Sequence, residues 1–166
     1  MKLAIALEFF TDQVRAAAVA FDAWDALEPD KTCSTLVAVA ARLSPAERDQ
    51  CRLAGLLQLL REQALGPELI VFDGLVHLDA QGTPGWGQLL YDALGGRVAV
   101  IGVSKRVTQG LPAQFEVMRE TEALPVIVTC VGIDLGAAKA RVRAMHGKRR
   151  MPTLLKLAAR NAKSLD

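Results

Sequence analysis

Apolar positions fall into two patterns along this chain, short runs before residue 44 and an alternation of helix-like and strand-like spacing after it. Residues 2–10, 14–24 and 33–43 are rich in apolar and β-branched side chains and are separated by short polar segments, which predicts three successive strands. The alanines of 14–24 would also suit a helix. Three strands joined by short turns predict an antiparallel meander.

A change of pattern at Ser44 predicts the first helix. Ser44 suits the N-cap, Pro45 the first helical position, and Glu47 stands three residues after the cap, which is the arrangement of a capping box. Gly66 is a typical residue at a helix end. Between these limits, leucines recur at helical spacing, namely Leu53, Leu56, Leu57 and Leu60.

The remainder of the chain alternates between strands and helices. Strands are predicted at 68–73, 97–105 and 125–131, and helices at 83–95, at about 135–145 and after Pro152. A short irregular or strand-like piece precedes the last strand. This order predicts an α/β fold, a mixed sheet of three antiparallel strands followed by alternating helices and strands, flanked by helices. It resembles the ribonuclease-H-like arrangement, in a single domain over residues 1–166.

Composition narrows the class of protein. The chain is 51% hydrophobic and 23% charged, which is ordinary for a folded domain and excludes disorder. No apolar run approaches the roughly 20 residues that span a bilayer, and the apolar N-terminus is broken by Glu8, so we expect a cytoplasmic protein with no membrane partner. Cys33, Cys51 and Cys130 form no CxxC pair and are expected to be small buried residues.

The net charge of +2 is unevenly distributed. Acidic residues dominate positions 1–30, whereas positions 139–163 contain basic residues and no acid. Such a one-signed segment favours a surface that contacts a polyanion, and an ordinary solvated face is the alternative. The phosphate contacts expected here are Lys148, Arg149, Arg150 and Lys156. Alternatively, the cations at 148–150 complement the dipole of a helix C-terminus.

A buried strand that ends on a carboxylate is the main chemical signal. Asp73 ends the apolar strand 68–73, Glu8 lies near the end of the first strand, and Lys105 ends the following strand. If the strands 2–10 and 68–73 are neighbours, the carboxylates of Glu8 and Asp73 converge and suit Mg²⁺ or Mn²⁺. Such ions activate water and stabilise the oxygens of a phosphodiester displacement. The alternative for Asp73 is a turn residue before Gly74.

Several of these segments resemble the endonuclease V family. "PELIVFDG" followed about thirty residues later by "IGVSK" is similar to two of its motifs, and "PVIVTCVGIDLGAAKARV" and "GKRRMPTLLKLAAR" look like its last strand and closing helices. The resemblance covers roughly residues 45–165. It implies a ribonuclease-H-like fold and a Mg²⁺-dependent endonuclease that cleaves nucleic acid near deaminated adenine (inosine), with a role in DNA repair.

The resemblance also implies a set of site residues. Asp73 and Lys105 match the family directly. The family's first-strand aspartate aligns with Leu7, with Glu8 one residue on, and its helix glutamate aligns with Arg52. A one-residue shift along a strand reverses the face, so Glu8 substitutes only if the strand is bulged or the alignment moves by one.

His77 or Asp79 takes the place of a family histidine that follows the Asp-Gly pair. The expected catalytic residues are therefore Asp73, Lys105 and His77, and the expected metal ligands are Glu8, Asp73 and Asp79. The first hypothesis is an endonuclease V-like nuclease that acts on nucleic acid. The second is a catalytically inactive homologue that binds nucleic acid or a protein partner without cutting. The oligomeric state is not predicted.

Overall fold

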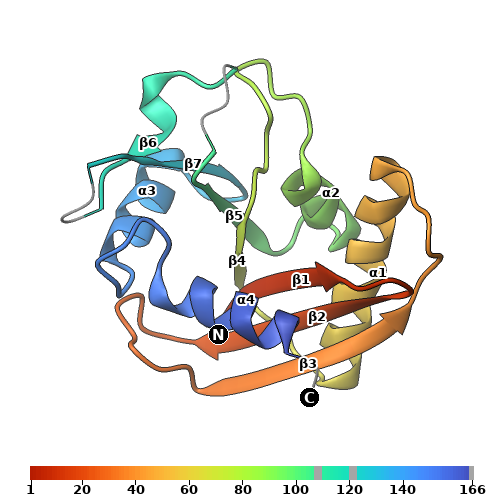
Figure 1. Cartoon of the computed structure of the whole chain (residues 1–166). Coiled ribbons are helices and arrows are strands. Elements are labelled where there is room, and N and C mark those ends of the chain that lie inside the picture. The colour runs from red at the N-terminus through yellow and green to blue at the C-terminus, as the bar shows by residue number, and fades with distance from the viewer. Residues whose placement is uncertain (107–109, 120–122, 165–166) are drawn as a thin grey trace.

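The computed structural model describes residues 1–106, 110–119 and 123–164. Within these ranges the strands form one seven-stranded mixed sheet in the order β3-β2-β1-β4-β5-β7-β6 (Figure 1). Strand β1 pairs in parallel with β4, and β4 in parallel with β5, whereas the pairs β1–β2, β2–β3, β5–β7 and β6–β7 are antiparallel. The strands are β1 (Lys2–Phe9), β2 (Gln13–Phe21), β3 (Lys31–Ala38), β4 (Leu69–Asp73), β5 (Ala99–Ser104), β6 (Glu116–Val117) and β7 (Val126–Val131).

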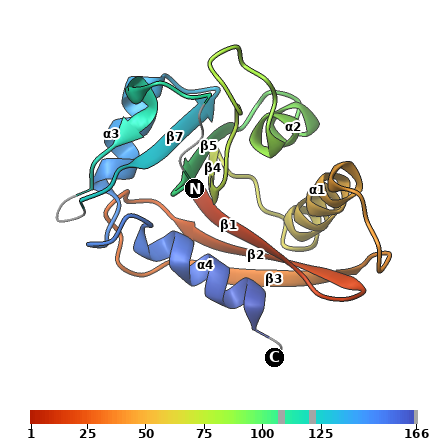
Figure 2. The same cartoon turned by 45° about the horizontal axis from the view of Figure 1, so that its top comes forward.

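Helices cover both faces of the sheet (Figure 2). The helices α1 (Pro45–Glu62) and α2 (Trp86–Ala93) pack on one face, and α3 (Leu135–Ala144) and α4 (Thr153–Lys163) pack on the other. A short 3₁₀ helix, η1, spans Ala113–Phe115. The arrangement confirms the predicted α/β, ribonuclease-H-like mixed sheet flanked by helices. Over the described residues, no helix combines the length and the apolar character needed to cross a membrane.

Some strands and helices are shorter than predicted, because their ends are set by the segments with which they pair. The second and third strands, predicted to reach residues 24 and 43, end at Phe21 and Ala38. Ala38 pairs with Gln13, the first residue of β2, so no partner strand remains for the residues that follow. The helix predicted from residue 83 begins at Trp86, because Pro84 forms an isolated bridge with His77.

The alanine-rich segment at 14–24 is a strand because it is buried on both faces. Ala16 and Ala18 lie under α1, while Val19 and Phe21 belong to the core under α3 and α4. Helix α1 approaches this strand closely at Gly55, where an added Cβ would lie 3.5 Å from the Val14 side chain. Small side chains on β2 therefore allow the helix to pack directly on the sheet.

Helix α1 begins as predicted and ends earlier than predicted. The Ser44 side chain accepts a hydrogen bond from the Glu47 amide at 3.2 Å, and the Glu47 carboxylate accepts one from the Ser44 amide at 2.9 Å. At the other end Ala64, with φ of 50°, occupies the left-handed position. The Leu65 amide then donates to the carbonyl of Leu60 at 2.9 Å. This closing turn resembles a Schellman motif, and it ends the helix before Gly66.

Candidate functional site

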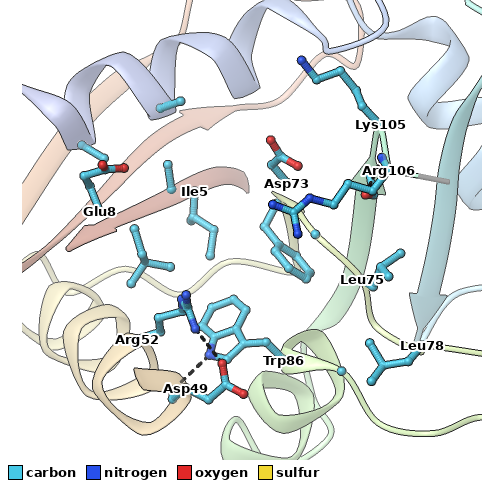
Figure 3. Close-up of a pocket in the computed structure, with 18 of the residues that line it drawn as sticks. Ile5, Glu8, Asp49, Arg52, Asp73, Leu75, Leu78, Trp86, Lys105 and Arg106 are labelled. Atoms are coloured by element: carbon cyan, nitrogen blue, oxygen red, sulfur yellow. Dashed lines mark hydrogen bonds and ion pairs between the residues drawn. The ribbon is translucent and has the colours of Figure 1, made fainter. Parts of the chain in front are cut away.

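A pocket of about 700 Å³ opens at the carboxyl ends of β1, β4 and β5. In an open sheet this is the edge where ligands bind. Figure 3 shows α4 along one side of the pocket, and α1 and the start of α2 along the other. The polar side chains that line it come from α1, from α4 and from the ends of β1, β4 and β5, and they are Glu8, Asp49, Arg52, Asp73, Ser104, Lys105, Arg106 and Lys163.

Asp73 is placed by a loop that crosses the neighbouring strand. The Gly74 amide donates to the Val103 carbonyl at 3.0 Å, and the Val76 amide donates to the hydroxyl of the fully buried Thr129 at 2.8 Å. The chain passes so close to β5 that a Cβ on Gly102 would lie 2.5 Å from the Gly74 carbonyl oxygen. Within the described part of the chain, these bonds hold the loop through its backbone and leave the Asp73 carboxylate without a hydrogen bond.

Glu8 and Asp73 lie on the same face of the sheet. Ile5 pairs with Phe72 in the parallel ladder, and continuing this register by one residue sets Ala6 beside Asp73. The ladder between β1 and β2 runs unbroken from Lys2 to Phe9, so β1 has no bulge. Glu8 is two residues beyond Ala6 and therefore shares its face, roughly 7 Å further along the strand.

Leu7 faces the opposite side, towards the core under α1. The sequence alignment places the family's first-strand aspartate at Leu7. A carboxylate at that position would point away from Asp73. Alanine occupies the register position beside Asp73, and Glu8 is the acidic residue of β1 that faces the same side.

Burial raises the pKa of the Asp73 carboxyl above its usual value of 3.8, while Lys105 and Arg106 act in the opposite direction. The side chain is accessible to solvent, but it stands inside a concave pocket whose walls remove part of its hydration. Figure 3 shows Arg106 extending from the end of β5 towards Asp73. The carboxylate therefore faces two cations at the end of β5.

The opposite side of the pocket carries a guanidinium from α1. Arg52 contacts the Asp49 carboxylate at 2.7 Å and lies 5.1 Å from the centre of the Phe9 ring. The Trp86 indole donates to the Asp49 carbonyl at 3.2 Å, and its ring stands edge-on to Phe72. Asp49 and Phe9 thus hold Arg52 at the pocket, at the position that aligns with the family's helix glutamate.

Two of the predicted site residues are engaged elsewhere. The Asp79 carboxylate accepts hydrogen bonds from the Thr83 hydroxyl at 2.6 Å, from the Thr83 amide at 3.1 Å and from the Gln81 amide at 3.0 Å. These bonds, led by that of the Thr83 side chain, lower the pKa of Asp79. His77 Nε2 shares a hydrogen bond of 3.0 Å with the Gln88 side chain. Neither Asp79 nor His77 lines the pocket, whereas Glu8, Asp73 and Lys105 line it together.

A second, smaller hollow of about 250 Å³ adjoins the pocket through Lys105. Its other lining residues are Arg149, Arg150, Met151 and Lys156. Of the four predicted phosphate contacts, three therefore gather at one place beside the pocket, and Lys148 is exposed outside it.

Several residues that line the pocket were not predicted as site residues. Tertiary packing brings three of them there, Arg52, Trp86 and Lys163, and Arg106 lines the pocket from the end of β5. Arg106 follows Lys105 directly, and that adjacency was a usable signal. Arg52 aligns with a family glutamate and Lys163 ends the basic segment 139–163, but neither signal indicated a cation at this pocket.

The described carboxylates of the pocket do not gather into a cluster that matches a complete metal site. Among the described residues no three or more His, Cys, Asp or Glu side chains gather closely enough to hold an ion together. Mg²⁺ often takes only one or two carboxylates and completes its shell with water and phosphate oxygens. Glu8 and Asp73 line the pocket from the same face of the sheet, with Glu8 roughly 7 Å further along its strand.

No protein-family model matches the chain, and no curated protein matches it in sequence. Solved structures match it closely in shape. Human endonuclease V has a TM-score of 0.74 at 17% identity, covering 98% of this chain and 82% of that one. Endonuclease V of Streptomyces avermitilis has a TM-score of 0.74 at 23% identity, with 96% and 79% covered.

Endonuclease V of Ciona intestinalis, in complex with a 24mer DNA containing an inosine followed by a ribo-adenosine, has a TM-score of 0.76 at 14% identity. That match covers 98% of this chain and 84% of the Ciona chain. Matches at such low identity establish the three-dimensional arrangement of the chain. The chain has the endonuclease V fold over nearly its whole length.

Proposed function

We propose that this chain binds nucleic acid through the phosphate backbone, with one phosphodiester seated in the pocket at the carboxyl ends of β4 and β5. The observation that carries the proposal is the convergence of four cations on this pocket, Arg52 from α1, Lys105 and Arg106 from the end of β5, and Lys163 from α4. The similarity in fold to a protein solved with DNA supports the class of ligand, as an argument by analogy.

The charges of the pocket favour an anion. Asp49 is engaged by Arg52, so Glu8 and Asp73 stand against three further cations. Because burial already disfavours the charged form of Asp73, an incoming phosphate would favour its protonation further. Lys105 and Arg106 are then the natural counter-ions of a phosphate group.

A second candidate function is metal-dependent cleavage of the same phosphodiester. The specific observation in its favour is that Glu8 and Asp73 share one face of the sheet and one pocket. These two residues would hold Mg²⁺ or Mn²⁺, which supplies an activated water and stabilises charge on the phosphate when bound. Lys105 would contact the scissile phosphate. A preference for deaminated bases is a further part of this candidate.

Binding is tested with labelled single- and double-stranded oligonucleotides in EDTA, over about 50 to 200 mM salt. We expect Lys105→Met to weaken binding to every sequence alike and to reduce the salt slope by about one. The control is Lys31→Met, which makes the same change at an exposed position outside both hollows. Wild-type protein that binds no oligonucleotide, or a Lys105 variant that binds as wild type does, would contradict the proposal.

Cleavage is tested with the same oligonucleotides, with and without inosine, after Mn²⁺ or Mg²⁺ is added. Cleavage that needs the ion and disappears in Asp73→Asn establishes the second candidate. Binding with no cleavage by any combination of ion and substrate excludes it and leaves the binding function. Equal cleavage of oligonucleotides with and without inosine excludes the preference for deaminated bases.

A further inference from the structure

Arg119 is a buried arginine that bonds to one segment of the backbone. It follows β6, its exposed fraction is 2%, and its guanidinium donates to four carbonyls. The bonds to Met145 and Arg149 are 3.0 Å long and the bond to Gly147 is 2.9 Å. The fourth acceptor is Val142. All four carbonyls belong to the last turn of α3 or to the turn that leads into α4.

This position suits the chemistry of a guanidinium. The final carbonyls of a helix have no partner within the helix and carry its negative dipole end. Arginine offers five donors in one rigid plane and stays charged when buried. Arg119 therefore satisfies the end of α3 and fixes the course of the chain after it.

The fixed segment is the one that carries the basic residues. Arg119 bonds to the carbonyl of Arg149 itself, and on the far side the Thr153 amide donates to the His146 carbonyl at 2.8 Å. Held at these points, the turn presents Arg149 and Arg150 to the hollow that Lys105 and Lys156 also line. No acidic residue is among the described residues that line this hollow.

We propose that this hollow is a second phosphate subsite and that Arg119 is the positioning residue that builds it. Four cations, with no carboxylate among the lining residues that the structure describes, suit a phosphate dianion or a phosphodiester. Because Lys105 lines both hollows, the subsite would take the phosphate next to the one in the pocket. The proposal rests on the proposed function and extends it to two successive phosphates of one strand.

The subsite is tested first by removing its charges. The double variant Arg149→Gln, Arg150→Gln is compared with Arg141→Gln, Arg143→Gln, which removes the same charge from exposed positions of α3 outside both hollows. We expect the first to reduce the salt slope of oligonucleotide binding by about two and the second to leave it unchanged. Equal effects of the two double variants would overturn the subsite.

The spacing is tested with oligonucleotides that carry one neutral methylphosphonate at successive positions. Two adjacent sensitive positions are expected for the wild type, and one for the Arg149, Arg150 variant. If the wild type shows one sensitive position that depends on Lys105, the subsite is wrong while the proposed function stands. If the wild type binds no oligonucleotide, the proposed function itself fails.

The positioning role is tested with Arg119→Gln and Arg119→Lys. Both should reduce the salt slope as the double variant does and speed hydrogen exchange of the amides at 145–151. Lysine should not rescue, because one ammonium group cannot reach four carbonyls in a plane. A folded Arg119→Lys protein with the wild-type salt slope would overturn the role. If both variants fail to fold, slow exchange at 145–151 in the wild type supports the role and fast exchange overturns it.

Discussion

Asp73, at the end of a buried strand, lies at the boundary between the apolar core and a cationic pocket. Four residues of β4, Leu69 to Phe72, are buried, and the next side chain turns into a pocket between the core and two cations. A carboxylate in this position is partly dehydrated yet carries no hydrogen bond from the described residues that hold its loop. At the level of single residues, this is the group whose ionisation should affect both folding and ligand binding.

Asp73→Asn should make the protein more stable at neutral pH. Since the folded-state pKa lies above 3.8, the folded protein binds more protons than the unfolded chain between the two values. Stability contributed by this residue is therefore present at low pH and falls as the pH rises through that window. Urea unfolding at a series of pH values should show a smaller loss of stability with rising pH in the variant. A variant less stable than the wild type at neutral pH would contradict this expectation.

The sequence marks the candidate functional side chains at the ends of strands, whereas tertiary packing adds others that no local pattern indicates. Asp73 and Lys105 were found because each follows an apolar run that could be recognised as a strand. Arg52 reaches the same pocket from a helix more than twenty residues earlier, and the alignment that placed it opposite a family glutamate did not predict a cation there. Asp79 was proposed as a ligand, although the Gly82 and Thr83 that follow are turn residues that favour the local hydrogen bonds observed.

At the scale of elements, the C-terminus of α1 is closed by a residue that is poorly suited to its backbone. Ala64 has φ of 50°, a region in which a Cβ is strained and glycine is not. The surrounding bonds, from the amides of Ala64 and Leu65 to the carbonyls of Arg61 and Leu60, impose the conformation. The strain belongs to the closing turn and not to the helix itself.

Ala64→Gly should therefore raise the free energy of unfolding by up to about 1 kcal/mol. Ala54→Gly, at an exposed position inside the same helix, should lower it by about 1 kcal/mol. The two changes are chemically identical, so opposite signs in urea unfolding would isolate the backbone conformation as the cause. The same sign for both would contradict the assignment of strain to Ala64.

The sequence predicts most of the helices and strands, but it does not predict the residues at which several of them begin and end. The capping box of α1 and the strand 68–73 are local patterns, and the structure has both. The ends of β2 and β3 depend on where a partner strand stops, and the start of α2 depends on the bridge at Pro84. These limits are set by pairing across the fold, which the pattern along one segment does not contain.

Across the whole molecule, the charge is arranged along the sheet. The acidic loop between β2 and β3 and Glu68 lie at the end where β1 and β4 begin, since Phe21 pairs with Lys2. There Lys2 contacts Glu68 at 3.4 Å, and the N-terminus lies 3.6 Å from Asp22. The cationic hollows lie at the opposite end. A net charge of +2 thus conceals a dipole that would orient a polyanion towards the pocket.

The register of β1 against β4 carries the last prediction. Ala6 stands beside Asp73 and lines the pocket, so Ala6→Asp should place a second carboxylate next to the first. Without an ion the two should repel and lower the melting temperature, and Mn²⁺ should restore it. Calorimetric titration should show tighter Mn²⁺ binding than in the wild type or in the uncharged control Ala6→Asn. Equal Mn²⁺ affinity in all three proteins would count against the assigned register.

That register is maintained by the backbone pairs of the ladders and by buried side chains on both faces of the sheet, and the partly buried Ala6 packs at the edge of one of these clusters. The pairing of β1 with β4 therefore decides which side chain stands beside Asp73. For protein engineering, position 6 is therefore the place where a single substitution tests whether a coordination site can be added to this fold.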